Sequence, residues 1–350
     1  MNHLEAQLDY PFGDTLPDTG TVMEVAPGLF WLRMALPFAL NHINLWLVDD
    51  ELDGQRGWTI VDCGIATEPT RAAWEQVFET ALHGRPVLRV IATHYHPDHM
   101  GLADWLCEKW KVRLWTTAGE YAVGRMMSAA LPGYNGPSMV EHYVANGLPR
   151  EAVNKVGERR SYYANLVPSV PATYRRLQDG TRFAMAGNTW QVITGFGHSP
   201  EHATLVCAER KLMISGDMVL PRISTNVSVQ CYEPESDPVK LYLDSLGKFA
   251  GLPADMLVLP SHGKPFRGLH TRIRQLREHH AERLEEVLAA CREKPMTACD
   301  IVPIMFKREL DAHQLSFALG EALAHLHALW FEGKLVRRQD EGGVYRFTAK

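Results

Sequence analysis

A dense histidine motif is the strongest chemical signal in the sequence. Its residues are THYHPDH at positions 93–99, directly after the apolar segment VLRVIA, which predicts a strand. Because His94 and His96 stand two residues apart in near-extended backbone, their side chains can point the same way. Asp98 and His99 add an oxygen and a nitrogen beside them. Neutral imidazole and carboxylate are ligands that zinc and related divalent ions accept, so the motif predicts a metal site.

Three further loops carry the same kind of chemistry. GHSPEH places His198 after an apolar strand, SGD places Asp217 after LMI, and PSHG places His262 after MLVL. Each polar residue stands at the predicted C-terminal end of a strand beside a small residue, where α/β enzymes commonly build their sites. Each alone is more often an ordinary turn residue, and the first motif alone could be a histidine-rich surface loop. Together the four loops favour one shared site.

The number of candidate ligands predicts two metal ions, with zinc as the expected metal. The ligands divide into three for the first ion, three for the second and one bridge: His94, His96 and His198; Asp98, His99 and His262; and Asp217. Two divalent ions bring four positive charges, whereas two carboxylates and a bridging hydroxide bring three negative ones. About one positive charge remains, which suits a developing oxyanion. Bound water at such a site has a pKa of about 7 instead of 15.7, which supplies a hydroxide nucleophile.

Two further residues are predicted to support the site. Asp62, in VDCG, ends an apolar strand and could orient a ligand histidine or the bound water, although a plain turn aspartate is an equal alternative. We therefore expect Asp98 and Asp62 to be the catalytic carboxylates. His202 lies four residues beyond His198, and a supporting or core histidine is the better interpretation than a ligand.

The elements that must position these loops alternate between strands and helices. Residues 21–64 are β-rich, 68–83 predict a helix and 87–94 a strand. A hairpin turning near Glu209 and Arg210 and a buried strand at 256–260 follow later in the chain. The pattern indicates an α/β domain over residues 1–268. Residues 118–165 break it and predict a mostly helical insertion, either at the mouth of the site or simply packed on the core.

The character of the sequence changes after Gly268. A long charged helical segment is followed by the helical QLSFALGEALAHLHALWFEG and by two short strands around a Gly-Gly turn. Helices followed by a terminal hairpin predict a small winged-helix-like domain over residues 269–350. Winged-helix shape alone does not establish nucleic-acid binding. The apolar content of its last helix favours an interaction role, such as forming a homodimer or closing off the site.

In the order VDCG, THYHPDH, GHSPEH, SGD and SHG, these motifs resemble those of the metallo-β-lactamase superfamily, over roughly residues 20–268. The resemblance implies an αββα sandwich with the metals at one edge between the sheets. It implies the same division of ligands and makes Asp62 a supporting residue. The C-terminal segment resembles the extension of the β-lactamase-like protein 2 group, whose relatives include endoribonucleases. Glyoxalase II thioesterases and acylhomoserine lactonases share the metal loops but usually end differently.

Some activities of the superfamily are less well matched. Met218-Val219-Leu220-Pro221 follows the bridging aspartate without the nearby tyrosine seen in lactonases. The Thr-His start and the pairing of Asp98 with His99 differ from the serine- or cysteine-containing sites of many true β-lactamases. We therefore expect neither lactonase activity nor antibiotic hydrolysis as the main role.

Three functions remain open from the sequence. The leading hypothesis is hydrolysis of a small ester, thioester or related acyl substrate by the dinuclear-site hydroxide. The second is a metal-dependent endoribonuclease, which would need the arginines after Gly268 to gather on one face, although acidic residues there nearly balance the charge. The third is a persulfide dioxygenase-like oxidoreductase with one iron.

Composition narrows the partners. The chain has 350 residues, of which 46% are hydrophobic. Its net charge of −5 gives it no overall positive electrostatic field that would hold nucleic acid or an anionic membrane surface. None of the six cysteines forms a CxxC pair, which favours reduced thiols. The N-terminus shows no signal-peptide pattern, and no apolar span is long enough to cross a membrane. We expect a cytoplasmic protein with a small-molecule substrate.

Overall fold

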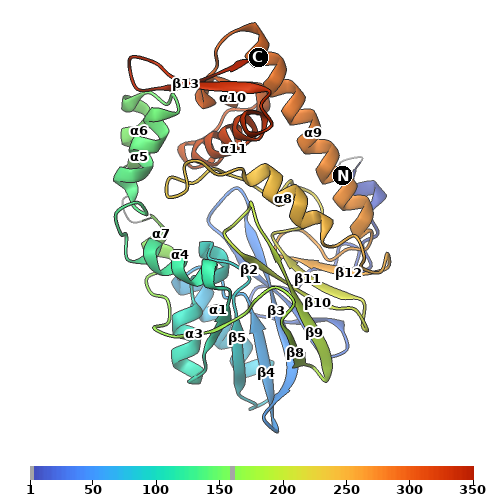
Figure 1. The fold of residues 1–350 in the computed structure, drawn as a ribbon. Coiled ribbons are helices and arrows are strands. Elements are labelled where there is room, and N and C mark those ends of the chain that lie inside the picture. Colours follow the sequence, from blue (N-terminus) through green and yellow to red (C-terminus); the bar gives the residue numbers. More distant parts are fainter. Residues whose placement is uncertain (1–3, 158–161) are drawn as a thin grey trace.

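The computed structural model describes residues 4–157 and 162–350 and contains two sheets that face each other (Figure 1). The first sheet has the strand order β1-β2-β3-β4-β5-β6-β7, antiparallel from β1 to β4 and parallel from β4 to β7. Its strands are β1 (Met23–Ala26), β2 (Leu29–Ala35), β3 (His42–Leu52), β4 (Gln55–Val61), β5 (Val87–Ile91), β6 (Leu114–Thr116) and β7 (Tyr174–Arg176).

The second sheet has the order β12-β11-β10-β9-β8, in which only the β11–β12 pair is parallel. Its strands are β8 (Arg182–Met185), β9 (Asn188–Gly195), β10 (His202–Cys207), β11 (Leu212–Gly216) and β12 (Leu257–Pro260). Strands β10 and β11 form the predicted hairpin, with the turn at Glu209 and Arg210 between them.

Apolar side chains of both sheets fill the space between them. Trp31 and Trp46 of the first sheet stack with ring centroids 6.4 Å apart, and both belong to the same buried cluster as Trp190 and Ile214 of the second sheet. Fully burying one such large apolar side chain contributes about 1.5–3 kcal/mol. All six residues of β10 and all five of β11 are buried, because both faces of these strands are covered. This explains why their sequences do not alternate between apolar and polar residues.

Helices cover the outer faces of the sheets, which gives the predicted αββα order (Figure 1). A second apolar cluster lies between the first sheet and the helices that cover it, and it includes Trp74 and Leu106. A third joins the second sheet to the later helices and includes Tyr242 and Leu276. The helices involved are α1 (Glu68–Thr80), α2 (Pro97–Met100), α3 (Ala103–Trp110), α8 (Pro238–Gly247) and α9 (Leu269–Glu293); a short 3-10 helix, η1 (Glu5–Gln7), precedes them.

The segment predicted as an insertion is helical and flanks the sheets on one side, extending toward the C-terminal part (Figure 1). Val123 packs into the second apolar cluster, whereas Tyr163, Met127 and Tyr134 contribute to that cluster and also line a cavity. Several side chains of this segment therefore both pack on the core and line the cavity. Its helices are α4 (Ala118–Ser128), α5 (Gly136–Ala145), α6 (Arg150–Gly157) and α7 (Tyr162–Leu166); residues 158–161 of the insertion lie outside the described residues.

The C-terminal part lies above the sandwich in Figure 1 and follows the predicted order of helices and hairpin. After α9 it consists of α10 (Ala298–Met305), α11 (Ala312–Phe331), β13 (Leu335–Gln339) and β14 (Tyr345–Ala349). A capping box in which Thr297 and Asp300 bond each other's backbone begins α10. The winged-helix assignment and the boundary at residue 268 stay predictions.

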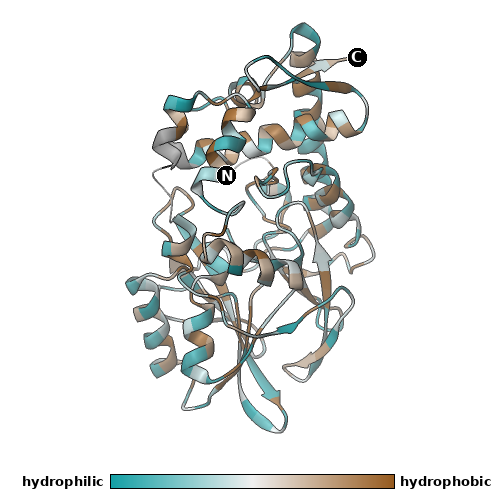
Figure 2. Ribbon diagram, turned by 60° about the vertical axis from the view of Figure 1, so that its left-hand side comes forward, coloured by the Kyte–Doolittle hydropathy of each residue, from teal (hydrophilic) through white to brown (hydrophobic). Residues whose placement is uncertain are grey.

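Figure 2 shows hydrophobic and hydrophilic residues alternating along the helices of both parts, as expected for helices with one packed face. Among the described residues, no helix combines the length and the apolar character that a membrane crossing needs.

Candidate metal centre

The 93–99 loop is shaped by its position between a buried strand and a short helix. Strand β5 ends at Ile91, and α2 begins at Pro97, whose fixed φ and missing N–H suit the first position of a helix. His96 precedes it with φ −54° and ψ 150°. The chain thus turns from extended to helical within the motif, so that His94 and His96 precede the turn while Asp98 and His99 lie on its far side.

One group of candidate ligands combines three loops. The ligand atoms of this group lie within 4.8 Å of one another. His94 Nε2 is 2.9 Å from His96 Nδ1 and 3.2 Å from His198 Nε2. His198 Nε2 is 3.5 Å from Asp217 Oδ2. The group therefore holds the three histidines predicted for the first ion together with one oxygen of the predicted bridge.

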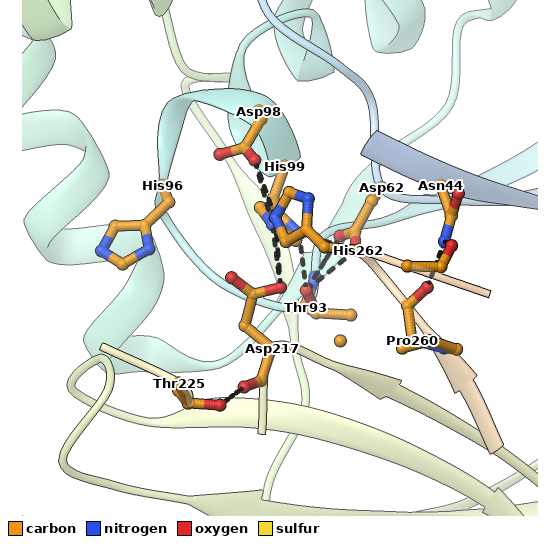
Figure 3. A network of polar contacts seen from close by, with 12 residues as sticks. Asn44, Asp62, Thr93, His96, Asp98, His99, Asp217, Thr225, Pro260 and His262 are labelled. Carbon is orange, nitrogen blue, oxygen red and sulfur yellow. Dashed lines mark hydrogen bonds and ion pairs between the residues drawn. The ribbon is translucent and has the colours of Figure 1, made fainter. Parts of the chain in front are cut away.

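The other group consists of Asp98, His99 and His262, whose ligand atoms also lie within 4.8 Å of one another (Figure 3). His262 Nε2 is 3.3 Å from Asp98 Oδ2, and His99 Nε2 is 3.7 Å from the same oxygen. Asp217 Oδ1 is 3.6 Å from both histidine nitrogens. Asp217 thus turns one oxygen toward each group, which is the arrangement a bridging carboxylate needs.

The geometry and the unsatisfied atoms fit metal ions. A tetrahedral ion with bonds of about 2.0–2.2 Å holds its ligand atoms roughly 3.3–3.6 Å apart, close to the separations observed here. His99 Nε2 and Asp217 Oδ1 are buried and have no hydrogen-bond partner among the described residues. Leaving such a group unsatisfied costs about 1–3 kcal/mol, more if it is charged, whereas a coordinated cation would satisfy both.

Contacts behind the ligands fix which histidine nitrogen faces the centre. The Nδ1–H of His198 donates to the carbonyl of Asn226 at 2.7 Å, and that of His262 donates to the carbonyl of His42 at 2.8 Å. His99 donates its Nδ1–H to Asp62 at 2.8 Å. Each contact leaves Nε2 as the lone-pair nitrogen, the tautomer that a metal ligand requires.

Asp62 lies behind the ligands and not at the mouth of the site. It is fully buried with a φ of 64°, and its Oδ1 accepts the backbone N–H of Thr93 at 2.8 Å. Its other oxygen accepts from His99. Of the two roles predicted for Asp62, the geometry supports orienting a ligand histidine, because no exposed surface of Asp62 faces bound water.

The bridging aspartate is held by its own backbone. Gly216, just before it, has φ +52°, and a Cβ there would lie 2.3 Å from His202 Nε2, so glycine is required. The N–H of Asp217 donates to the same nitrogen of His202 at 3.1 Å. Thr225 Oγ1 donates to the carbonyl of Asp217 at 2.5 Å. His202 therefore holds the backbone of the residue predicted to bridge the two ligand groups.

The electrostatic environment matches a cation-binding centre. Burial lowers the pKa of His96 to about 3, which leaves a neutral imidazole at pH 7. Burial also acts to lower the pKa of His99, but the carboxylates of Asp62, Asp98 and Asp217 outweigh it and raise that pKa to about 9. The carboxylates therefore create a negative potential strong enough to hold a proton on His99. A divalent cation at the same place would satisfy that potential and displace the proton.

Several residues that position the loops carry no motif. The buried carboxylate of Glu120, on α4, accepts the N–H of Tyr95 at 2.8 Å, the hydroxyl of Ser199 at 2.7 Å and the N–H of Glu201 at 2.6 Å. One side chain thus joins the loop of His94 and His96 to the loop of His198. Asn44 similarly holds the loop of His262, through the carbonyls of Pro260 and Gly263. A lone glutamate or asparagine gives no spacing signal, so sequence patterns could not find them.

The fold and this cluster define the class of protein. Residues 40–262 match the model of the metallo-beta-lactamase superfamily, and residues 284–350 match the model described as metallo-beta-lactamase-like, C-terminal domain. The chain therefore belongs to the metallo-beta-lactamase superfamily, whose members bind divalent metals, and it is a hydrolase of that fold with a C-terminal domain.

Particular relatives span nearly the whole chain. It is 58% identical to a beta-lactamase domain protein from Burkholderia ambifaria, whose crystal structure matches with a TM-score of 0.94 over 100% of both chains. It is 29% identical to the metallo-beta-lactamase family protein TTHA1429 from Thermus thermophilus, with a TM-score of 0.77 over 93% of this chain and 100% of that one. It is 25% identical to the probable metallo-hydrolase YqjP of Bacillus subtilis (strain 168), over 91% of this chain and 97% of that protein.

Proposed function

We propose that the chain hydrolyses a small ester, thioester or related acyl compound with a hydroxide nucleophile generated at a dinuclear metal centre. The observation that carries the proposal is the division of the candidate ligands into two groups that share Asp217. The designation of the Bacillus relative as a probable metallo-hydrolase supports it. Zinc is the metal that this set of imidazoles and carboxylates suits.

Two divalent ions held by these residues would lower the pKa of bound water to about 7 and stabilise negative charge on the substrate oxygen. The protein's part is to hold and orient. His94, His96 and His198 would hold one ion, and Asp98, His99 and His262 the other, with Asp217 between them. In the reaction, the oxygen of water joins the acyl carbon, the C–O or C–S bond breaks, and a proton passes to the departing alcohol or thiol.

The two catalytic carboxylates have different tasks in this proposal. The side chain of Asp98 is 17% exposed, so it can contact water entering the site. Although burial raises its pKa, the neighbouring His99 and His262 outweigh burial and lower the pKa to about 2, so Asp98 is ionised at neutral pH. We assign Asp98 to bind metal and orient water, and Asp62 to position His99.

The contacts of the arginines after Gly268 give the endoribonuclease alternative less support than the hydrolase proposal. Arg272 is buried and donates to the carbonyls of Leu220 and Ile223. Arg277 donates to the carbonyl of Leu243, and Arg337 pairs with Glu235. These three arginines are thus engaged in internal contacts, which favours a structural role for them over a phosphate-binding face. The alternative of a persulfide dioxygenase-like protein with one iron gives no role in metal binding to the second ligand group.

The test is metal quantification coupled to a substrate panel of thioesters, esters and lactones. We expect two ions per chain in the wild type, loss of one with His96→Ala, and loss of both metal and activity with Asp217→Ala. His279→Ala on α9 is the matched control, since this histidine belongs to neither ligand group. One iron per chain with oxygen consumption on a persulfide, or no hydrolysis of any panel member, would overturn the proposal.

Location and assembly belong to the same proposal. The six cysteines are free thiols, which is consistent with a cytoplasmic protein. A homodimer through the C-terminal domain stays a prediction that the oligomeric state in solution would test.

A further inference from the structure

A cavity of about 180 Å³ opens beside the candidate metal centre. His96, a candidate ligand, lines it together with its neighbours Tyr95 and Pro97. The other walls come from three separate parts of the chain: the helical insertion, residues 228–232 of the loop after β11, and helix α11 of the C-terminal part. A group bound in this cavity therefore lies against the centre, with an end near the first ligand group.

The walls are mainly apolar and aromatic, and their polar side chains, such as Asn135, Ser228 and Gln230, are uncharged. Tyr134 and Tyr232 stack with ring centroids 4.8 Å apart, and Met127, Met139 and Phe317 also line the space. None of the lining residues among the described parts of the chain is Lys, Arg, Asp or Glu. A cavity of this kind binds uncharged groups, because burying an unpaired charge costs several kcal/mol.

The hydroxyls of three lining tyrosines are engaged with the protein. The hydroxyl of Tyr163 donates to the carbonyl of Tyr95 at 2.5 Å, and the hydroxyls of Tyr95 and Tyr232 lie 3.3 Å apart. Burial lowers the pKa of His142 to about 4, so this imidazole is neutral at pH 7. The tyrosines therefore present ring surface to the cavity more than hydrogen-bonding groups.

The volume sets the size of the occupant. Apolar cavities of about 150 Å³ in proteins bind benzene, which has six carbons. A cavity of about 180 Å³ therefore admits an apolar group of six carbons or slightly more.

From this geometry we propose that the cavity binds the acyl group of the substrate, and that this group is uncharged, apolar and about six carbons or slightly more in length. The inference rests on the proposed hydrolase function and names its substrate class. The acyl carbon would lie at the His96 end, where the ligand groups begin, and the tail would extend between the insertion and α11. The C-terminal domain thus contributes to substrate selection through Phe317.

The test uses acyl thioesters of N-acetylcysteamine from acetyl to octanoyl with the metal-loaded full chain. Burying one methylene is worth about 0.8 kcal/mol, so kcat/KM is expected to rise about fourfold per methylene up to hexanoyl and then level off. Adipoyl, which has six carbons but ends in a carboxylate, is expected to react at least about 100-fold more slowly than hexanoyl. A flat dependence on chain length would overturn the proposal.

Two variants locate the effect. Ala164→Trp, on the cavity side of α7, should bring hexanoyl hydrolysis down to the acetyl level while acetyl hydrolysis is retained. Phe317→Ala should lower kcat/KM for hexanoyl about tenfold and leave acetyl unchanged. Phe331→Ala is the matched control, because Phe331 is also an exposed phenylalanine of α11, 50% against 44% for Phe317, but does not line the cavity. Equal effects of both phenylalanine variants would contradict the assignment.

A binding measurement separates this proposal from the proposed function. Saturation-transfer NMR with hexan-1-ol, which has no acyl carbon to attack, should show binding to the wild type and loss of binding in Ala164→Trp. If no thioester is hydrolysed but hexan-1-ol still binds in this way, the hydrolase function fails and the apolar site stands. If thioesters are hydrolysed but hexan-1-ol does not bind, the apolar site fails and the hydrolase function stands.

Discussion

Replacing Asp62 by asparagine tests how the second ligand group is held. Asp62 accepts three hydrogen-bond donors: the N–H and hydroxyl of Thr93 and the Nδ1–H of His99. Asparagine keeps the shape and one acceptor oxygen, which can still accept from Thr93. Its NH₂ group would then face the Nδ1–H of His99, so that two donors meet. His99 can escape only by moving its proton to Nε2, the nitrogen that faces Asp98 and Asp217.

The size of the effect follows from that tautomer. Losing a carboxylate partner behind a ligand histidine typically weakens metal binding 10–100-fold, which corresponds to about 1.4–2.7 kcal/mol. The loss should fall on the ion held by Asp98, His99 and His262. The ion held by His94, His96 and His198 should be affected less, because Asp62 contacts the side chain of His99 directly but reaches that of His94 through the hydroxyl of Thr93.

The assay is a Zn²⁺ titration against a chromophoric chelator, which resolves the affinities of two sites. Wild type and Asp62→Asn are compared with Asp49→Asn, whose carboxylate pairs with Arg85 at the surface away from the centre. We expect one site of Asp62→Asn to keep its affinity and the other to weaken 10–100-fold, with Asp49→Asn unchanged. Two unweakened sites in Asp62→Asn, or a larger loss at the first site, would refute the reasoning.

Three further perturbations have defined outcomes. Burial raises the pKa of Glu120 to about 7, so this group stabilises the fold below its unfolded pKa near 4.5 and loses that contribution as pH rises through about 7. Denaturant titrations of wild type and Glu120→Gln measure this contribution. The unfolding free energy of wild type minus that of the variant should fall by about 3 kcal/mol from pH 4.5 to 8. Asp50→Leu should lower the unfolding free energy by about 3–5 kcal/mol, since it leaves the buried guanidinium of Arg89 without its 2.5 Å partner. Chelation should lower the thermal midpoint by several degrees and Zn²⁺ should restore it, because a ligand at 1,000 times its Kd adds about 4.1 kcal/mol; an unchanged midpoint in calorimetry would count against metal binding.

The pattern of the sequence was sufficient to predict an α/β domain and the loops that meet in it, and the family resemblance implied the αββα sandwich. Long apolar strands such as β10 and β11 can be recognised from their run of apolar residues. Each of the four loops that carry candidate ligands directly follows one predicted strand or precedes the next. Because strand ends of one fold face a common edge, residues far apart in sequence could be expected to meet there. His198 and His262 lie beside Asp217 for this reason.

Other parts of the fold and of the candidate site could not be predicted from the sequence, for physical reasons. Strand β7 pairs with β6, although the whole helical insertion separates the two strands in the sequence. Strand β7 has only three residues, and two of its side chains are exposed, so it shows no apolar periodicity. The loop between Asp217 and Asp237 has no regular pattern, yet Thr225 and Asn226 hold two candidate ligands through their contacts. Such contacts depend on where a chain segment lies in three dimensions, and local spacing carries no record of it.

The C-terminal helix is built into the site through this same loop. On α11, the carboxylate of Glu321 accepts the side-chain N–H of Asn226 at 3.1 Å, and the carbonyl of Asn226 accepts from the candidate ligand His198. At the preceding residue of α11, a Cβ on Gly320 would lie 2.7 Å from the hydroxyl of Ser228, so helix and loop touch directly. Because the same loop and helix also wall the apolar cavity, one interface both orients a metal ligand and shapes the space beside it. We therefore expect a substitution at Gly320, which lines the cavity and meets this loop, to act on metal binding and on substrate choice together.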